Sequence, residues 1–277
     1  GVRPARMIRG ESRHPLAWMA LLAIVLLAVQ RWLAGPSPDL PVLSPPGEAL
    51  PAAALGEDFA APASDRRIRV DGGGTLDEDQ VARVLRAGGQ AGQWAAFTWQ
   101  LGGRDVALVA PGLDARHHFA QAYLVGYLPH PGVEAWVPLA TLARRKRYRF
   151  DHESHGGTDV WQTSRQAWHL AEGDCEDHAI ALADWLIGLG LDARVAVGTW
   201  RGGGHAWVVL FEGGRTYLLE ATHKRPNRAM PLAAMMADYR PIAMFDRERY
   251  WVNTGSPLTT DYAGSAWQVR SRFERLR

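Results

Sequence analysis

The chain has 277 residues, enough for one large domain or for a smaller domain with extensions. Hydrophobic residues make up 47% of it and charged residues 22%, a composition that excludes an intrinsically disordered protein. The formal net charge of +2 gives no reason to expect a nucleic-acid partner. Because Cys175 is the only cysteine, an intramolecular disulfide and a zinc site with several thiolate ligands are also excluded.

The first 35 residues have the layout of an export signal. Residues 16–29 form an uncharged apolar run, and four arginines precede it. A positive segment followed by an apolar one is typical of a secretory signal or a signal anchor. The apolar segment extends over 16–34, close to the ~20 residues of a membrane-spanning helix. We therefore expect a bacterial protein anchored in the inner membrane with the rest of the chain in the periplasm; secretion after signal cleavage is the alternative.

Residues 36–65 are expected to be a linker, because seven prolines stand there among alanines and such a segment forms no regular element. Residues 66–150 are expected to form an N-terminal α+β region, to which the sequence assigns no role. A basic run at 144–149 ends this region. We interpret the run as a solvated helix end or a membrane-proximal surface in preference to a nucleic-acid site.

Within this region the apolar spacing predicts a helix over residues 76–87. Residues 95–101 and 105–110 predict two short strands around a Gly-Gly turn. Residues 115–146 are expected to be mostly helical, with a break near Pro129–Pro131.

Residues 151–277 hold the features that carry chemistry and are expected to be the catalytic core. A short helix is predicted over 163–172. A longer helix follows Asp174, because apolar residues recur at helical spacing from Ala179 to Ile187. This spacing predicts that the second helix packs one face on the core.

Cys175 is a candidate nucleophile because it lies in the first turn of that second helix. Unpaired backbone N–H groups and the positive end of the helix dipole favour the thiolate, which is the nucleophilic form. Asp174, Glu176 and Asp177 oppose this effect, because like charge disfavours the thiolate. A cationic partner would favour the thiolate, so a histidine further along the chain becomes important.

That histidine, His205, begins the second of three strands predicted between residues 193 and 221. The second and third strands are joined by Gly213-Gly214, which is typical of a two-residue hairpin turn. Because side chains alternate between the two faces of a strand, this turn places His205 and Glu220 on one face as diagonal neighbours. A three-residue turn would place them on opposite faces.

The expected roles follow from this arrangement. Cys175 attacks a carbonyl carbon, His205 pairs with the thiolate and protonates the leaving amine, and Glu220 orients the imidazole. The backbone N–H of Cys175 forms half of an oxyanion hole. Trp161 or Gln162 is the candidate for the other half, through an indole or an amide donor.

Three segments carry a resemblance to a known family: GDCEDHAIALADWLIGLGLDARV at 173–195, GHAWVVL at 204–210 and LLEAT at 218–222. In order and spacing they resemble the transglutaminase-like superfamily, and especially its bacterial cysteine proteases. The resemblance implies a papain/transglutaminase-like α+β core in which the nucleophile helix packs on an antiparallel sheet. By position it carries the nucleophile, the base and the orienting acid to Cys175, His205 and Glu220. It covers nothing before residue 150.

The resemblance also has a departure and a further implication. The third catalytic residue of the family is more often Asp, whereas this chain has Glu220. In some bacterial members the acids beside the cysteine bind calcium. Asp174 and Glu176 stand in those positions, which implies a possible calcium site, although helix capping explains Asp174 equally well.

The function expected from these features is a membrane-tethered, extracytoplasmic cysteine hydrolase that cleaves a protein or peptide through a Cys175, His205 and Glu220 triad and a thioester acyl-enzyme. Three alternatives stay open. One is a transamidase that cross-links proteins with the same triad, and another is a catalytically inactive binding module with the same fold. The third is a metal site formed by Cys175, His178 and His205, with His152 and His155 nearby.

Overall fold

The computed structural model describes residues 60–62, 65–88, 95–154, 159–226 and 228–275. The predicted anchor at 16–34 and nearly all of the predicted linker lie outside the described residues. Among the described residues, no helix is both long and apolar enough to cross a membrane.

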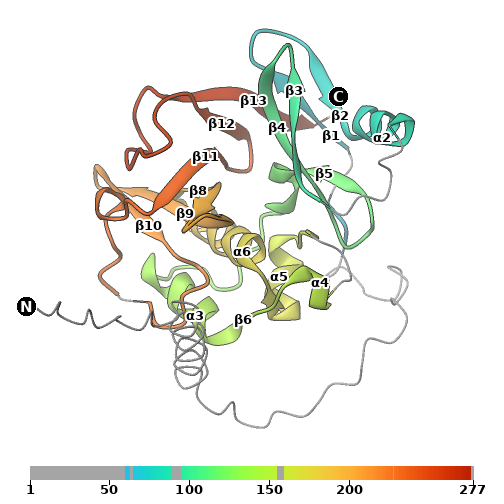
Figure 1. The fold of residues 1–277 in the computed structure, drawn as a ribbon. Coiled ribbons are helices and arrows are strands. Elements are labelled where there is room, and N and C mark those ends of the chain that lie inside the picture. The colour runs from blue at the N-terminus through green and yellow to red at the C-terminus, as the bar shows by residue number, and fades with distance from the viewer. Residues whose placement is uncertain (1–59, 63–64, 89–94, 155–158, 227, 276–277) are drawn as a thin grey trace, which may run out of the picture. The chain divides into compact units, whose positions relative to one another are not determined.

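The described residues form a mixed α+β structure around an eight-stranded sheet, so the predicted fold class is confirmed (Figure 1). The strand order is β10-β9-β8-β11-β12-β13-β1-β2, and all neighbouring strands are antiparallel. These strands are β1 Arg66–Val70, β2 Thr75–Asp77, β8 Asp192–Trp200, β9 Gly203–Glu212, β10 Arg215–Leu219, β11 Tyr239–Phe245, β12 Arg249–Asn253 and β13 Trp267–Arg275.

Two smaller sheets and several helices complete the fold. A three-stranded sheet has the order β3-β4-β5, and β6 pairs with β7 in parallel. The further elements are α2 Glu78–Ala87, β3 Phe97–Leu101, β4 Arg104–Pro111, β5 His117–Phe119, η3 Ala120–Tyr123, α3 Trp136–Arg145, β6 Arg147–Tyr148, α4 Asp151–Ser154, α5 Ser164–Leu170, β7 Glu172–Gly173, α6 Cys175–Gly188 and η4 Ala233–Met235.

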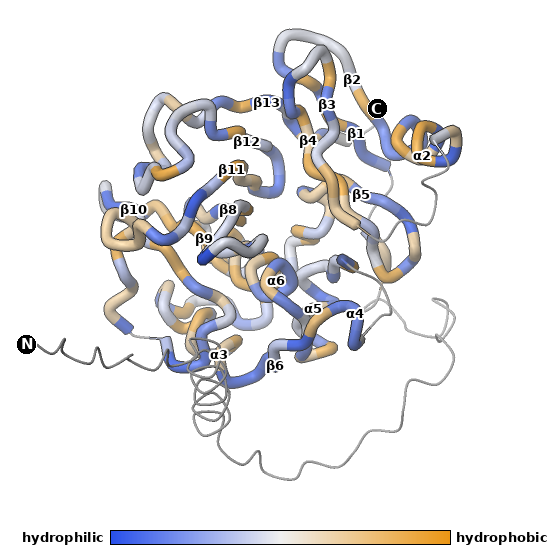
Figure 2. The backbone as a smooth tube through the Cα atoms, in the orientation of Figure 1, coloured by the Kyte–Doolittle hydropathy of each residue, from blue (hydrophilic) through white to orange (hydrophobic). Residues whose placement is uncertain are grey.

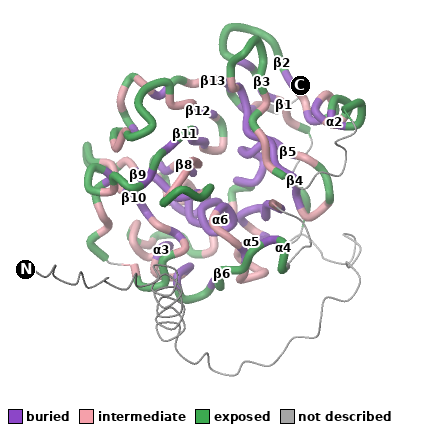
Figure 3. The backbone as a smooth tube through the Cα atoms, in the orientation of Figure 1, coloured by how far each residue is buried: buried purple, intermediate pink, exposed green. Residues whose placement is uncertain are grey.

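Helix α6 lies at the centre of the largest hydrophobic core, where the alternate residues Ala206, Val208 and Leu210 of β9 pack in the same cluster (Figures 1 and 2). Every residue from Glu176 to Leu186 is buried, so α6 appears purple in Figure 3. The prediction of one packed face was therefore wrong: α5 and α3 also pack on α6.

The opposite face of the sheet carries a second core that contains Trp207, Val209 and Leu218. The period-two alternation along β9 and β10 thus fills both faces of the sheet. A third core joins β1, β2 and α2 to β4 and β5, and Phe273 of β13 belongs to it. Because β1 pairs with β13 along its whole length, the region 66–150 and the region 151–277 share one sheet.

The predicted helix over 115–146 was wrong for its first half. Residues 117–119 form strand β5, residues 120–123 form a 3-10 turn, and helix α3 begins only at Trp136. Strand β5 forms because it pairs with the buried strand β4, a tertiary contact that overrides local propensity. The helix and two strands predicted earlier in the region were confirmed, with Asp77 as the N-cap of α2.

Candidate active site

Cys175 is the first residue of α6, as its sequence position predicts. Its side chain is half-buried, and its thiol donates a hydrogen bond to Glu176 Oε2 at 3.3 Å. Asp174 is the N-cap residue, but its side chain makes no hydrogen bond to the helix N-terminus. The backbone N–H groups of the first turn are therefore not capped by this carboxylate, which leaves them for an anionic group beside Cys175.

His205 and Glu220 meet at the open end of the β9–β10 hairpin. Arg215 pairs with Glu212 across Gly213-Gly214, so the predicted two-residue turn is confirmed. Both glycines have positive φ, of 58° and 72°, which this type of turn requires. The expected register brings His205 Nε2 to 2.8 Å from Glu220 Oε2.

Cys175 is the second side chain that acts on His205. Cys175 and His205 line the same cleft, and because Glu220 occupies Nε2, Nδ1 is the ring nitrogen left for the sulfur. Burial lowers the pKa of His205, but the hydrogen bonds to Cys175 and Glu220 outweigh it and raise the pKa to about 9. The imidazole is therefore cationic at neutral pH and can stabilise a thiolate.

Glu220 is held by three residues. Besides His205, it accepts hydrogen bonds from the backbone N–H and hydroxyl of Thr222 at Oε1, and from the hydroxyl of Tyr239 at Oε2. Burial raises the pKa of Glu220, but the hydrogen bond and charge of His205 and the Thr222 hydrogen bonds lower it to about 2. Glu220 is thus an anion fixed in one orientation. Its side-chain contacts fix it, because strand β10 ends one residue earlier, at Leu219.

Tyr239 is a site residue that the sequence reasoning missed. It begins β11, pairs with Trp200 of β8, and donates to Glu220 at 2.7 Å. The rings of Trp200, Trp207 and Tyr239 lie 5.4–6.1 Å from the His205 ring and cover the imidazole. No local sequence pattern could have identified Tyr239, because a sheet crossover brings β11 beside β8.

A cleft of about 490 Å³ opens beside Cys175 and His205. One wall comes from Thr98 and Leu108 of the β3–β4 hairpin, and another from Gly198 and Gly204 of β8 and β9. We call this space the nucleophile cleft. A Cβ atom on Gly204 would contact nothing, so a substrate backbone can approach this strand closely.

The two predicted side-chain donors for an oxyanion hole are engaged elsewhere. Trp161 lines the nucleophile cleft, but its indole N–H donates to Asp159 Oδ1 at 2.7 Å. Gln162 is buried, and its amide donates to the carbonyl of Glu172 at 3.1 Å. The structure therefore brings neither donor to Cys175, because β7 and the neighbouring carboxylate hold them.

Five carboxylates gather beneath the start of α6: Asp151, Asp159, Asp174, Glu176 and Asp177. Asp151, Glu176 and Asp177 are buried, and each has one carboxylate oxygen with no hydrogen-bond partner among the described residues. Burial, with repulsion from Asp174, raises the pKa of Asp151 to about 7, and burial also raises the pKa of Glu176 and Asp177. We call these five residues the acidic cluster; the sequence reasoning assigned two of them, Asp174 and Glu176, to a calcium site.

Lys146 lies on the other side of Asp177. Its side chain is only 1% exposed, and its ammonium group donates to the carbonyls of Ala167 and Glu172. Burial lowers the pKa of Lys146 to about 8, and the charge of Asp177 opposes that shift. Interpreting the whole basic run 144–149 as solvated was therefore wrong at this residue.

His178 does not form the predicted alternative metal site with Cys175. Its Nδ1 donates to the carbonyl of Asp174 at 2.6 Å, and its Nε2 lies 3.3 Å from the ammonium group of Lys224. Both ring nitrogens are thus occupied. Among the described residues, the groups that could hold a metal contain carboxylates and Cys175 but no histidine. His155, which the same alternative invoked, lies outside the described residues.

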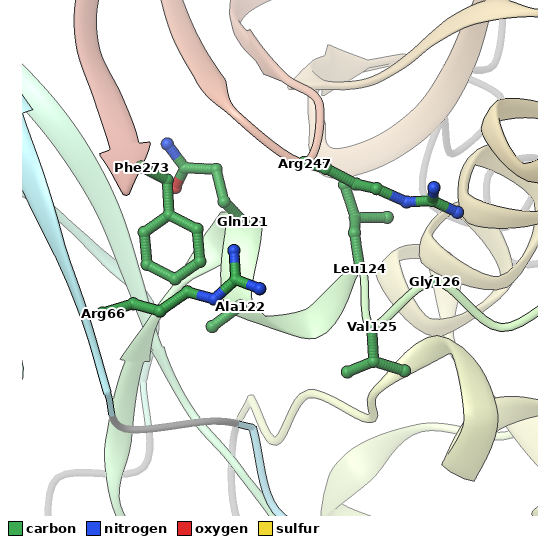
Figure 4. A pocket seen from close by; sticks show the side chains of 8 residues that line it. All are labelled: Arg66, Gln121, Ala122, Leu124, Val125, Gly126, Arg247 and Phe273. Carbon is green, nitrogen blue, oxygen red and sulfur yellow. The ribbon is translucent and has the colours of Figure 1, made fainter. Parts of the chain in front are cut away.

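In a cavity elsewhere, the described residues that line it include no cysteine, serine or histidine (Figure 4). It measures about 270 Å³, and Arg66, Gln121, Arg247 and Phe273 line part of it. Arg247 turns toward α6 and pairs with Asp184 at 2.6 Å. The amide atoms of Gln121 are fully buried, out of reach of a ligand in this cavity.

Comparisons with known proteins give partial matches to this chain. A family model described as the CEP76 peptidase-like domain matches residues 159–269, which is less than half of the chain. The Centrosomal proteins of 76 kDa from Xenopus tropicalis and Mus musculus are each 56% identical over 55 residues, or 20% of this chain. The chain spans only 8% of the length of these curated relatives.

Among solved structures, calcium-bound LapG from Legionella pneumophila is similar to part of this chain. It is 17% identical, with a TM-score of 0.38, and the match covers 53% of this chain and 83% of LapG. Residues 159–269 include Cys175, His205 and Glu220, so the peptidase-like family model matches the segment in which these three residues lie.

Proposed function

We propose that this protein is a cysteine hydrolase that cleaves a protein or peptide substrate. The observation that carries the proposal is the chain of contacts from Cys175 through His205 to Glu220, beside a cleft of about 490 Å³. A nucleophile, a base and a group that orients the base are the parts that acyl transfer requires. The similarity of residues 159–269 to a peptidase-like domain supports the same chemistry.

The reaction follows from the positions of the two ring nitrogens of His205. The Cys175 thiolate attacks the substrate carbonyl carbon while Glu220 holds Nε2–H, and the oxyanion forms near the first backbone N–H groups of α6. The imidazolium gives its Nδ1 proton to the amine as the C–N bond breaks, leaving a thioester on Cys175. Neutral His205 then takes a proton from water, which attacks the thioester, releases the acid and restores the pair of Cys175 thiolate and His205 imidazolium.

The acceptor of the acyl group decides between hydrolysis and transamidation. Purified wild-type protein and Cys175→Ser are incubated with an envelope extract of the producing cells, and new protein termini are identified by mass spectrometry. We expect new termini only with the wild type. Isopeptide links would instead indicate transamidation, and identical products from both proteins would contradict an acyl-transfer enzyme and indicate a binding role.

We also propose that the acidic cluster binds a calcium ion. The unpartnered oxygens of Asp151, Glu176 and Asp177 fit a cation, because like charges packed together without counter-ions are costly. Oxygen ligands on one calcium ion lie within about 5 Å of one another. Ligand atoms of Asp151, Asp174 and Asp177 lie within 4.8 Å of one another, as do those of Asp151, Asp159 and Glu176.

In this position calcium would neutralise the carboxylates and fix the loop that carries Cys175. Heat denaturation with calcium or with a chelator tests the proposal. A calcium concentration of ~100 Kd adds about 2.7 kcal/mol, which raises the melting temperature by about 5–10 °C. Asp151→Asn is expected to reduce this rise, whereas Asp79→Asn, which changes a highly exposed carboxylate of α2, keeps it. No calcium effect on the wild type would contradict the site.

The cellular location belongs to the same proposal. The apolar run and preceding arginines favour an inner-membrane anchor at residues 16–34 with the hydrolase in the periplasm. Fractionation of cells that produce the full chain tests this: we expect the protein in the membrane fraction and sensitive to protease from the periplasmic side. Recovery in the cytosol would contradict both the anchor and the secretion alternative.

A further inference from the structure

A second cavity, of about 810 Å³, is lined by residues that differ from those of the nucleophile cleft. Trp200, Glu220 and Tyr239 line it, and these three residues also contact His205. This cavity therefore adjoins the residues that surround His205, which itself lines the nucleophile cleft. We call it the basic pocket because of the charges described next.

Three cationic side chains line the basic pocket: Arg201, Lys224 and Arg225. Among the described residues that line it, Glu220 is the only carboxylate, and its charge is already paired with His205. Lys224 donates to the backbone carbonyl of Lys146, which leaves its charge uncompensated. Within the described part of the chain, Arg201 and Arg225 have no carboxylate within ion-pair distance. The pocket thus carries a positive charge that the described residues do not neutralise.

Arg201 is held in a conformation that favours recognition. It lies in the two-residue turn between β8 and β9 with a φ of 49°, a left-handed region that non-glycine residues rarely occupy. Its guanidinium group stacks over the Trp200 ring at 4.6 Å. The arginine is therefore placed before any ligand arrives, which reduces the entropy lost on binding.

Apart from Thr222 and His223, the rest of the pocket lining is apolar. Leu139, Pro231 and Met236 line it together with the rings of Trp200 and Tyr239. A small anion alone would leave this surface exposed. A peptide that carries a carboxylate next to an apolar side chain complements both parts of the pocket.

We propose that the basic pocket binds an acidic segment of the polypeptide substrate, with a Glu or Asp side chain near Arg201 and Arg225 and an apolar neighbour on the pocket floor. This inference rests on the proposed hydrolase function and adds a substrate class to it. The cleavage site then lies next to an acidic residue, because the pocket begins at Glu220 and Tyr239, beside His205.

Peptide binding to the full chain with Cys175→Ser tests the inference without any cleavage. The probes are a fluorescein-labelled peptide with Glu between Leu and Phe residues, and the same peptide with Gln in place of each Glu. We expect the acidic peptide to bind about tenfold tighter, with the difference decreasing at high salt. Adding Arg201→Gln and Arg225→Gln should abolish the difference, whereas Arg83→Gln with Arg104→Gln, which removes the same charge from two exposed positions outside the pocket, should preserve it.

Equal binding of the two peptides would overturn the inference, as would a difference that survives Arg201→Gln with Arg225→Gln. Arg201→Glu with Arg225→Glu excludes misfolding as the cause, because it should create a preference for a Lys peptide. Cleavage is measured separately with the wild type. Selective binding of the acidic peptide by a wild-type protein that cleaves nothing would overturn the hydrolase function and support the pocket.

Discussion

The charge of His205 is set by two neighbours that oppose burial. Its hydrogen bonds to Cys175 and Glu220 raise its pKa to about 9, so the imidazolium persists well above neutral pH. Tyr239 and Thr222 act one step further out, because they fix the Glu220 carboxylate that contacts Nε2. The protonation state that acyl transfer needs therefore depends on residues that never touch the substrate carbonyl.

Replacing Glu220 by Gln removes this negative charge but keeps the size of the side chain. Burial then lowers the pKa of His205 with less opposition, toward or below its ordinary value of 6.5. The activity of Glu220→Gln in peptide hydrolysis should therefore decline above a lower pH than that of the wild type, which is expected to decline only near pH 9. The measurement is kcat/KM against pH, and we expect a loss of about 100-fold at pH 8.

Tyr239→Phe serves as the graded comparison, because it removes one hydrogen bond and leaves the carboxylate in place. Its alkaline limit should lie between those of the wild type and Glu220→Gln. An unchanged pH profile in Glu220→Gln would show that Glu220 does not control His205.

At the scale of residues, the sequence predicted those site residues whose positions depend on their neighbours in the chain. Cys175 at a helix start and the parity of His205 and Glu220 both follow from local periodicity. The positions of Tyr239 and Lys146 do not follow from local periodicity. A sheet crossover brings Tyr239 to the site, and Lys146 is buried where its ammonium group contacts the carbonyls of Ala167 and Glu172.

At the scale of elements, a buried histidine joins α2 to β5. His118 is 1% exposed and lies between Glu78, the first residue of α2, and Asp114, at 3.0 Å from each. Burial lowers its pKa, but the hydrogen bonds and charges of the two carboxylates outweigh this and raise it to about 9. The charged imidazolium of His118 thereby stabilises the third core, between α2 and β4–β5.

The pH dependence of the free energy of unfolding tests this stabilisation by His118. Because the folded pKa of His118 lies above the unfolded value of 6.5, its contribution is complete below pH 6.5 and disappears as the pH rises through about 9. His118→Gln should lower the free energy of unfolding by about 3 kcal/mol at pH 6 and by much less at pH 10. Urea unfolding at both pH values measures the difference. An equal loss of unfolding free energy at pH 6 and pH 10 would contradict stabilisation by the charged form of His118.

Elements were predictable where a turn or a cap specifies them. The Gly213-Gly214 hairpin and the capped helix α2 are of this kind. Strand β5 was mistaken for helix, because its strand character comes from pairing with β4 and from no pattern of its own. The full burial of α6 was likewise missed, because it depends on α3 and α5 packing on the side away from the sheet.

At the scale of the whole molecule, the catalytic region is completed by the residues before it. Strand β1 pairs with β13, and the β3–β4 hairpin supplies a wall of the nucleophile cleft. The Asp159 carboxylate also accepts a hydrogen bond from the backbone N–H of Ala96. The region 66–150, which had no role in the sequence, thus supports both the sheet and the substrate site.

A chain that starts at residue 151 should therefore not fold. It would expose β13 and the third core, which includes Phe273. We expect insoluble protein or the absence of a cooperative unfolding transition. Removal of residues 1–49, which lie outside the described residues, is the control and should preserve cooperative unfolding of the rest of the chain. A soluble, cooperatively unfolding fragment 151–277 would contradict this account.

The most direct test of the central claim is the alkylation rate of Cys175. Because it is the only cysteine of the chain, iodoacetamide reports on it alone. If His205 stabilises the thiolate, the wild type should react at pH 7 at least ~10-fold faster than His205→Ala, with Glu220→Gln between them. Equal rates in the wild type and His205→Ala would contradict a catalytic Cys175, His205 and Glu220 triad.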